Sequence, residues 1–145
     1  MRYTEQRARL SARWNVSPWA WGVCADMSVT DRQQRSMGYM LSGNIGRKWK
    51  WLQANLSGNY FHTDNYDSRL YAYERGVLQS FSVGSFWGHG VRCALVVRAD
   101  VNSHCMLTVK TGTTAYFDRK TVGTALQTVN SSVLTTVDCQ LRYAF

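Results

Sequence analysis

The sequence contains little proline and no long apolar run. One proline and eleven glycines occur among 145 residues, which excludes collagen-like and proline-rich disordered chains. The longest stretch without a polar side chain, around Cys93 to Val97, is far shorter than the roughly 18 apolar residues of a membrane-spanning helix. The sequence therefore predicts no transmembrane helix.

Acidic residues are also scarce. Against 17 Lys and Arg there are 9 Asp and Glu, so the formal net charge is +8 although only 18% of the residues are charged. The chain has 145 residues, of which 45% are hydrophobic. This length and composition indicate one ordered domain and exclude a disordered or coiled-coil chain. The start, Met1 to Glu5, lacks the apolar core of a signal peptide. We therefore expect that a leader has been removed or that the chain is a piece of something larger.

Apolar and polar residues alternate with a period of two, the period of a β-strand, through most of the chain. No segment has a sustained helical period, so the pattern predicts an all-β protein. In the final segment the odd-numbered residues from Val133 to Phe145 are mostly apolar, whereas Asp138 and Arg142 lie on the other face. The candidate strands cover residues 4–15, 19–30, 36–46, 50–62, 68–75, 77–85, 90–101, 103–116 and 132–145.

These candidate strands are mostly longer than ordinary strands of about 5–6 residues, and they match the roughly 9–11 residues of a tilted membrane-crossing strand. The connections at 16–18, 47–49, 75–76 and 102–103 are tight, whereas those at 31–35, 63–67, 86–89 and 117–131 are longer. Alternation of short and long connections is typical of outer-membrane barrels. We predict an antiparallel up-and-down meander of about eight to nine long strands, which forms a transmembrane β-barrel or part of one.

Tryptophans gather beside the tight turns. Amphipathic rings favour the boundary between lipid headgroups and hydrocarbon, although the same rings could pack a soluble core. We predict one interfacial girdle formed by Trp14, Trp19, Trp21, Trp49, Trp51 and Tyr143.

Charged residues occupy the polar side of several strands. In a barrel they would face the lumen, either as a structural ion-pair network or as an anion-attracting surface that holds a channel or a plug. Because the cations are dispersed along strands rather than gathered in a patch, we do not expect nucleic-acid binding. The predicted lumen-facing set is Arg7, Arg9, Arg13, Asp26, Arg92, Arg98, Asp100, Asp138 and Arg142.

The C-terminal segment Val137–Phe145 resembles the closing-strand signal of bacterial outer-membrane β-barrels, with Val137, Cys139, Leu141, Tyr143 and Phe145 at its alternate positions. The segments Tyr66–Glu74, Phe81–Val83, Gly88–Arg92 and Val122–Thr124 resemble the C-terminal end of large outer-membrane proteins of Bacteroidota, some of which carry N-terminal helix-hairpin-helix modules. The present chain has no such module and is shorter.

This resemblance implies residence in the bacterial outer membrane and a role as a channel or transport component, or as a structural partner in a membrane complex. It implies contact with membrane lipid or lipopolysaccharide and with the barrel-assembly machinery. We also expect additional barrel strands or a partner chain, so that residues 1–145 are a single barrel domain or the C-terminal fragment of a larger barrel that does not close alone.

Residues that could carry other chemistry are scattered. Cys24, Cys93, Cys105 and Cys139 form no CxxC motif and have no histidine at ligand spacing, so we expect no metal site and interpret the cysteines as small apolar residues. The segments His62–Asp64 and Ser103–His104 do not fix a nucleophile beside a base. We expect no catalytic residues and no cofactor.

An alternative is a soluble calycin-like barrel that binds a small hydrophobic ligand. In that fold the apolar face points inward, and alternation alone does not decide which face is inside. The number of arginines on one face and the lack of a capping helix favour the membrane barrel.

Overall fold

The computed structural model describes residues 4–31, 34–73, 83–122 and 128–145. The described part contains nine strands and one short 3-10 helix, η1, and none of its helices is long and apolar enough to span a membrane. The elements are β1 (Thr4–Val16), β2 (Trp19–Asp31), β3 (Arg35–Lys48), β4 (Leu52–Thr63), η1 (Tyr66–Ser68), β5 (Leu70–Tyr73), β6 (Val83–Phe86), β7 (His89–Asp100), β8 (Cys105–Tyr116) and β9 (Val133–Tyr143).

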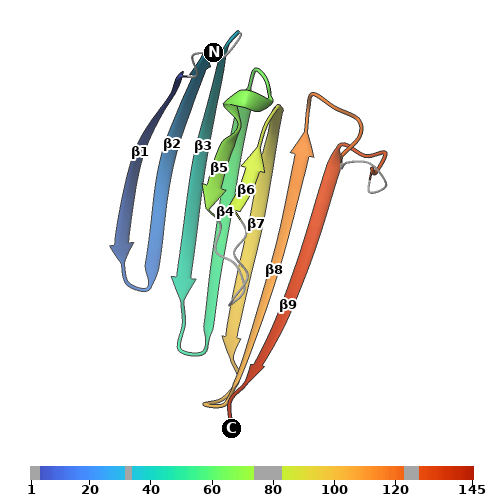
Figure 1. The fold of residues 1–145 in the computed structure, drawn as a ribbon. Helices are drawn as coiled ribbons and strands as arrows, with labels where there is room; N and C mark the ends of the chain where they lie inside the picture. Colours follow the sequence, from blue (N-terminus) through green and yellow to red (C-terminus); the bar gives the residue numbers. More distant parts are fainter. Residues whose placement is uncertain (1–3, 32–33, 74–82, 123–127) are drawn as a thin grey trace.

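Seven long antiparallel strands form one sheet in the order β1-β2-β3-β4-β7-β8-β9 (Figure 1). Each strand pairs with its neighbour along the chain, except that β4 pairs with β7 across the inserted β5 and β6. The predicted all-β up-and-down meander is therefore confirmed. The seven strands of this sheet have 11 to 14 residues, and seven of the nine predicted ranges match them closely.

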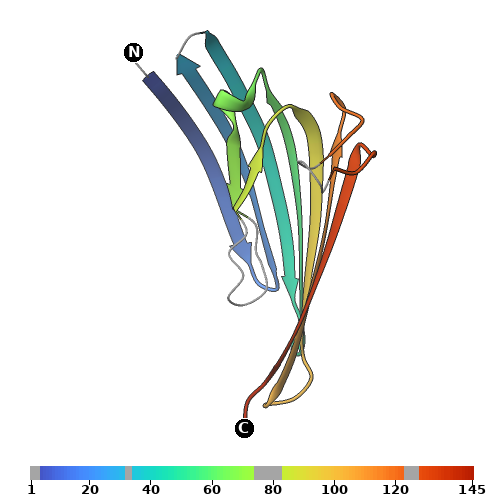
Figure 2. The same ribbon diagram turned by 45° about the vertical axis from the view of Figure 1, so that its right-hand side comes forward.

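The prediction that residues 68–75 and 77–85 are two further long strands is wrong. They contribute only the four-residue strands β5 and β6, which form a separate two-stranded sheet. This hairpin lies across one face of the long sheet, and the sheet curves around that side (Figure 2). In the described part of this hairpin, Leu70, Ala72 and Phe86 pack onto the long sheet. The predicted turn at 75–76 lies outside the described residues.

Tight turns gather at one end of the sheet, after Val16, Lys48 and Asp100. The two long connections, after Thr63 and Tyr116, lie at the other end, where β1 begins, while the C-terminus lies with the tight turns (Figure 1). The predicted longer connection at 31–35 is wrong, because Asp31 pairs directly with Arg35. Short and long connections therefore do not alternate along the whole chain: the first three are short, and only those from β4 to β7, which includes the β5–β6 hairpin, and from β8 to β9 are long.

The strands β1 and β9 are the two edges of the long sheet and do not pair with each other. This agrees with the expectation that the segments 4–15 and 132–145 do not close a barrel between them. Neighbouring strands of the sheet run in opposite directions, and β1 and β9 are the first and the seventh of its strands. They therefore run in the same direction.

Candidate functional site

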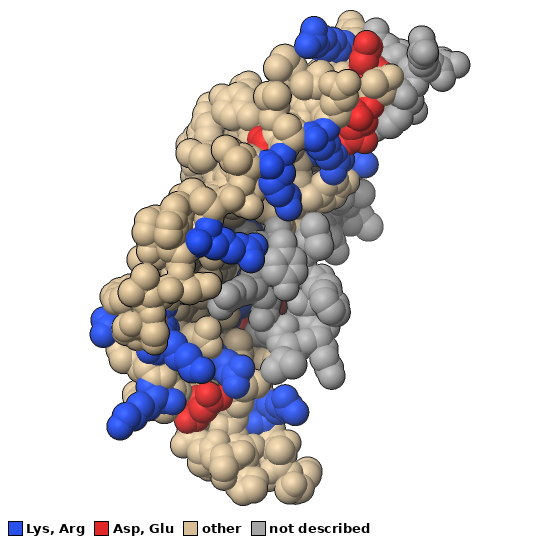
Figure 3. Space-filling view, turned by 90° about the vertical axis from the view of Figure 1, so that its left-hand side faces the viewer, with Lys and Arg blue, Asp and Glu red and all other residues tan. Residues whose placement is uncertain are grey.

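One face of the long sheet is polar and lies under the hairpin. Residues directly opposite each other on neighbouring strands share a face, and the register connects Arg9 with Asp26, Asp26 with Met40, and Met40 with Phe61. We call this side the polar face. The same registers place on it all nine charged residues predicted to line a lumen, from Arg7 on β1 to Arg142 on β9. Figure 3, which looks onto the β1 edge, shows Lys and Arg in a row along the molecule.

Ion pairs neutralise part of this charge. Arg9 on β1 pairs with the largely buried Asp26 on β2, and within single strands Arg7 pairs with Glu5 and Arg98 with Asp100. Lys110 is buried and lies directly opposite Asp138. Arg13 and Arg142 form no ion pair within the described part of the chain. The polar face therefore combines a few separate ion pairs with an excess of positive charge.

Hydrogen bonds join η1 to the sheet below it. The buried hydroxyl of Ser36 on β3 contacts Asn65 Oδ1 at 2.6 Å and the Ser68 hydroxyl at 2.7 Å. The Ser68 hydroxyl also donates to the carbonyl of Met37 at 3.2 Å. Gly38 is needed at this contact, because a Cβ there would lie 2.5 Å from the Ser68 carbonyl oxygen. The start of the hairpin segment is thus fixed at one place on the polar face.

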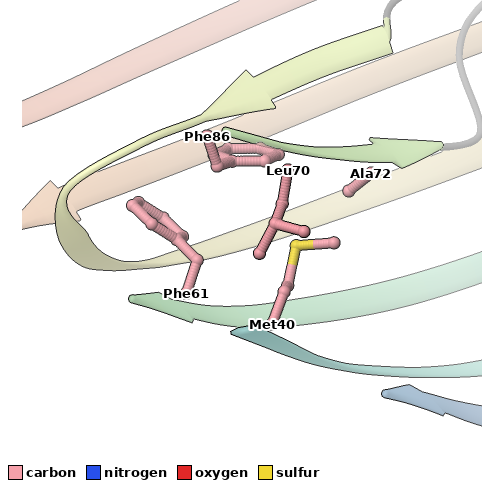
Figure 4. Close-up of a cluster of buried hydrophobic side chains, with 5 residues drawn as sticks. All are labelled: Met40, Phe61, Leu70, Ala72 and Phe86. Atoms are coloured by element: carbon pink, nitrogen blue, oxygen red, sulfur yellow. The ribbon is translucent and has the colours of Figure 1, made fainter. Parts of the chain in front are cut away.

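An apolar cluster joins the hairpin to the sheet. Leu70, Ala72 and Phe86 from the hairpin pack on Met40 and Phe61, the two large apolar side chains of the sheet that are fully buried (Figure 4). Burial of such side chains stabilises a contact by roughly 1.5–3 kcal/mol each. The hydrophobic core of the described structure therefore lies between the hairpin and the polar face.

A second contact holds the end of the hairpin segment. The Arg119 guanidinium, in the connection after β8, lies 3.8 Å from the ring centroid of Trp87 and donates to the Trp87 carbonyl at 3.0 Å. Arg119 also pairs with Asp118 at 3.0 Å. Burial by itself would raise the pKa of Asp118, but the hydrogen bond and the charge of Arg119 hold that pKa below its usual value. The two long connections are thus joined by the contact of Arg119 with Trp87, and the ion pair with Asp118 holds Arg119 in place.

The opposite face is apolar and exposed. Leu10, Leu41, Val137 and Leu141 are each at least 60% exposed, whereas Ser28, Thr30 and Ser36 on the polar face are almost completely buried. We call this side the apolar face. On the strands, its charged residues Asp31, Arg35 and Arg47 stand at strand ends. Burial is therefore the reverse of that in an ordinary soluble sheet, where polar side chains face water.

The six residues of the predicted girdle lie at the end with the tight turns, and each is exposed. Trp14 and Trp21 are opposite each other and stack at 4.2 Å. Tyr143 ends β9 and contacts Phe145 at 5.2 Å between ring centroids. The structure thus gathers these rings in one zone, which we call the tight-turn belt.

A second aromatic zone lies near the other end of the apolar face and was not predicted. We call it the second belt; Tyr60 donates to or accepts from His89 Nε2 at 2.8 Å, and His89 contacts His62 at 5.0 Å between ring centroids. The members come from the three strands β3, β4 and β7 and from the residue that follows β8, so only the register reveals the cluster. It consists of Tyr39, Tyr60, His62, His89 and Phe117.

The structure does not bring the side chains of His62, Thr63 and Asp64 together, although these residues are consecutive in the sequence. His62 contacts Tyr39 and His89, whereas Thr63 accepts a hydrogen bond from Gly88 and Asp64 accepts one from Met37. The four cysteines are free, and the part of the chain that the structure describes contains no group of three or more His, Cys, Asp or Glu arranged to hold a metal ion.

No family model, curated protein or solved structure matches this chain. The features of this molecule that bear on function are the two faces of the sheet and the hairpin that lies on the polar face.

Proposed function

We propose that this chain forms part of the wall of a transmembrane β-barrel in the bacterial outer membrane, and that it serves as a channel or transport component or as a structural partner in a membrane complex. The reversed burial carries the proposal. A sheet that exposes leucine, valine and tryptophan while it buries serine, threonine and aspartate suits lipid outside and water inside.

The two aromatic belts support this orientation. Trp51 and Tyr60 are nine residues apart, or about 30 Å along a strand and about 23 Å across a membrane at a tilt of about 40°. The apolar band of outer-membrane barrels is about 25 Å tall and has an aromatic girdle at each boundary. The spacing between the two belts therefore supports a membrane-spanning orientation.

The polar face would line the lumen, and the hairpin would narrow it. An excess of arginine and lysine over carboxylates attracts anions into such a space. We therefore propose that small anionic solutes are favoured over cations. The role is non-enzymatic, and it involves neither a cofactor nor nucleic acid.

The wall needs further strands. Bare strand edges are not tolerated in hydrocarbon, because each unpaired backbone group costs several kcal/mol. Since β1 and β9 run in the same direction, an odd number of added strands completes an antiparallel wall and gives the even total of bacterial single-chain barrels. These strands would come from a longer form of this chain or from a partner chain, and Phe145 would be read by the assembly machinery.

The alternative, a soluble calycin-like barrel, requires the apolar face to be the enclosed one. The hairpin covers the polar face instead, and the buried core lies beneath it. The position of the core therefore does not support this alternative.

Extraction behaviour tests the proposal. We expect the full-length protein in cells to fractionate with membranes, to leave them only with detergent, and to migrate differently on a gel before and after heating. A protein that is released without detergent and shows no heat-dependent migration would favour the soluble barrel and contradict the membrane assignment.

A further inference from the structure

The apolar face carries a groove near the tight-turn belt. The groove has a volume of about 690 Å3, and Trp21, Val23, Ile45 and Leu56 form its sides. Its floor is made by Gly43 and Gly58, which lie directly opposite each other on β3 and β4. A Cβ at either glycine would meet nothing within 4 Å, so the absence of two side chains creates the hollow.

One arginine lies beside this groove, in contact with the lining residue Trp19. Arg47 follows Ile45 on the same face of β3, and its guanidinium lies 4.8 Å from the ring centroid of Trp19 and 4.9 Å from that of Trp49. The Arg47 Nε is buried and has no hydrogen-bond partner. Among the described residues Arg47 also has no carboxylate partner, so two rings flank a cation whose charge no acidic side chain neutralises.

The neighbouring turn adds charge of the same sign. Arg47, Lys48 and Lys50 are three cations within four residues, and the segment 47–50 contains no acid. An anion bound at this place would therefore meet a tryptophan-flanked guanidinium beside a turn of positive charge. Arginine is well suited to phosphate because its donors form a planar fork.

We propose that the groove binds one anionic glycerophospholipid, with an acyl chain over Gly43 and Gly58 and the phosphate beside Arg47. An extended apolar hollow that ends in an unpaired cation at the aromatic belt has the shape and the charge of such a lipid. The inference rests on the proposed function, because a headgroup can lie beside Arg47 only if the tight-turn belt marks a membrane boundary.

Fluorescence quenching tests this binding. The full-length protein is reconstituted into phosphatidylcholine vesicles in which either phosphatidylglycerol or phosphatidylcholine has brominated acyl chains, which quench nearby tryptophans. We expect brominated phosphatidylglycerol to be favoured about fivefold, the effect of one cation near an anionic surface. Arg47→Gln should abolish the preference, whereas Arg35→Gln, on the same face at the other end of β3, should retain it.

A second variant examines the groove itself. Gly58→Leu fills the floor and should reduce the preference while Arg47 is intact. Equal quenching by both lipids in the parent protein, or a preference that survives Arg47→Gln, would overturn the inference but leave the membrane assignment intact. Chemical cross-linking of the same samples tests for a second copy of the chain in the groove. If the parent protein forms a cross-linked dimer without any lipid preference, and Gly58→Leu loses that dimer, the groove belongs to a second copy and the inference is also overturned. Absence of quenching by either lipid would instead contradict the proposed function.

Discussion

The ring of Phe61 on β4 packs against the ring of Phe86 on β6, with centroids 5.0 Å apart and planes inclined by 36°. Phe61 belongs to the long sheet, and Phe86 belongs to the hairpin that lies on it. Because the buried apolar cluster is concentrated at this contact, it controls whether the hairpin stays on the polar face. The first prediction concerns this contact.

Phe86→Ala should detach the hairpin without unfolding the long sheet. Truncation of a buried phenylalanine costs about 3–5 kcal/mol of stability. Here this cost weakens the packing of the hairpin on the long sheet. We expect faster protease cleavage between β4 and β7, measured by mass spectrometry, with heat-dependent gel migration unchanged. Ser85→Ala changes an exposed neighbour on the same strand and should have no effect. Equal cleavage of both variants would contradict this role of the cluster.

Asp26→Asn should increase anion selectivity. The substitution removes the carboxylate that neutralises Arg9 on the polar face, so the positive excess there grows. Reversal potentials across a planar bilayer with a KCl gradient would measure the change, and Arg13→Gln should shift the potential the other way. If neither variant alters the potential, these charges do not line a conducting path.

Leu141→Arg should destabilise the inserted protein more than Gln140→Arg. Leu141 is on the apolar face and Gln140 on the polar face of the same strand. An arginine on the lipid side costs about 2–4 kcal/mol of folding free energy at the midplane and less near the interface. Leu141 is close to Tyr143 of the tight-turn belt, the proposed interface, whereas Val137 is farther from it. Val137→Arg should therefore cost more than Leu141→Arg. Urea unfolding from vesicles measures these free energies. Similar values at all three positions would refute the assignment of this face to lipid.

Deletion of Phe145 should impair assembly more than stability. Phe145 lies beyond the end of β9 and is fully exposed, with a ring contact to Tyr143, so little folding energy depends on it. We expect less inserted protein in cells but nearly unchanged unfolding of material refolded in detergent. Phe145→Trp retains an aromatic terminus and serves as the control. Normal insertion of the deletion variant would show that the residue is not an assembly signal.

Acidification should loosen the contact between the two long connections. The pKa of Asp118 is lower in the folded protein than the usual value of about 4, so its pairing with Arg119 stabilises the fold fully above about pH 4. This contribution disappears as the pH falls through the lowered pKa. Tryptophan fluorescence, which includes that of Trp87 beside Arg119, should change in this range, and Asp118→Asn should remove the transition. A transition that persists in Asp118→Asn would belong to another group.

The sequence alone determined the strands and the composition of their two faces. Alternation between polar and apolar residues is a local property, so it revealed β1, β2 and β9 almost to the residue and separated Arg142 from Tyr143. The sequence also indicated the tight-turn belt, because its tryptophans lie next to predicted turns.

Only the tertiary structure decided which pairs of strands meet and which face is covered. Residues 70–73 and 83–86 alternate like wall strands, but packing of Leu70 and Phe86 on Phe61 placed them on the polar face. The second belt and the glycine-floored groove join residues from separate strands, such as Gly43 and Gly58. Their proximity depends on register, which is set by long-range pairing between strands and is not encoded in any local pattern.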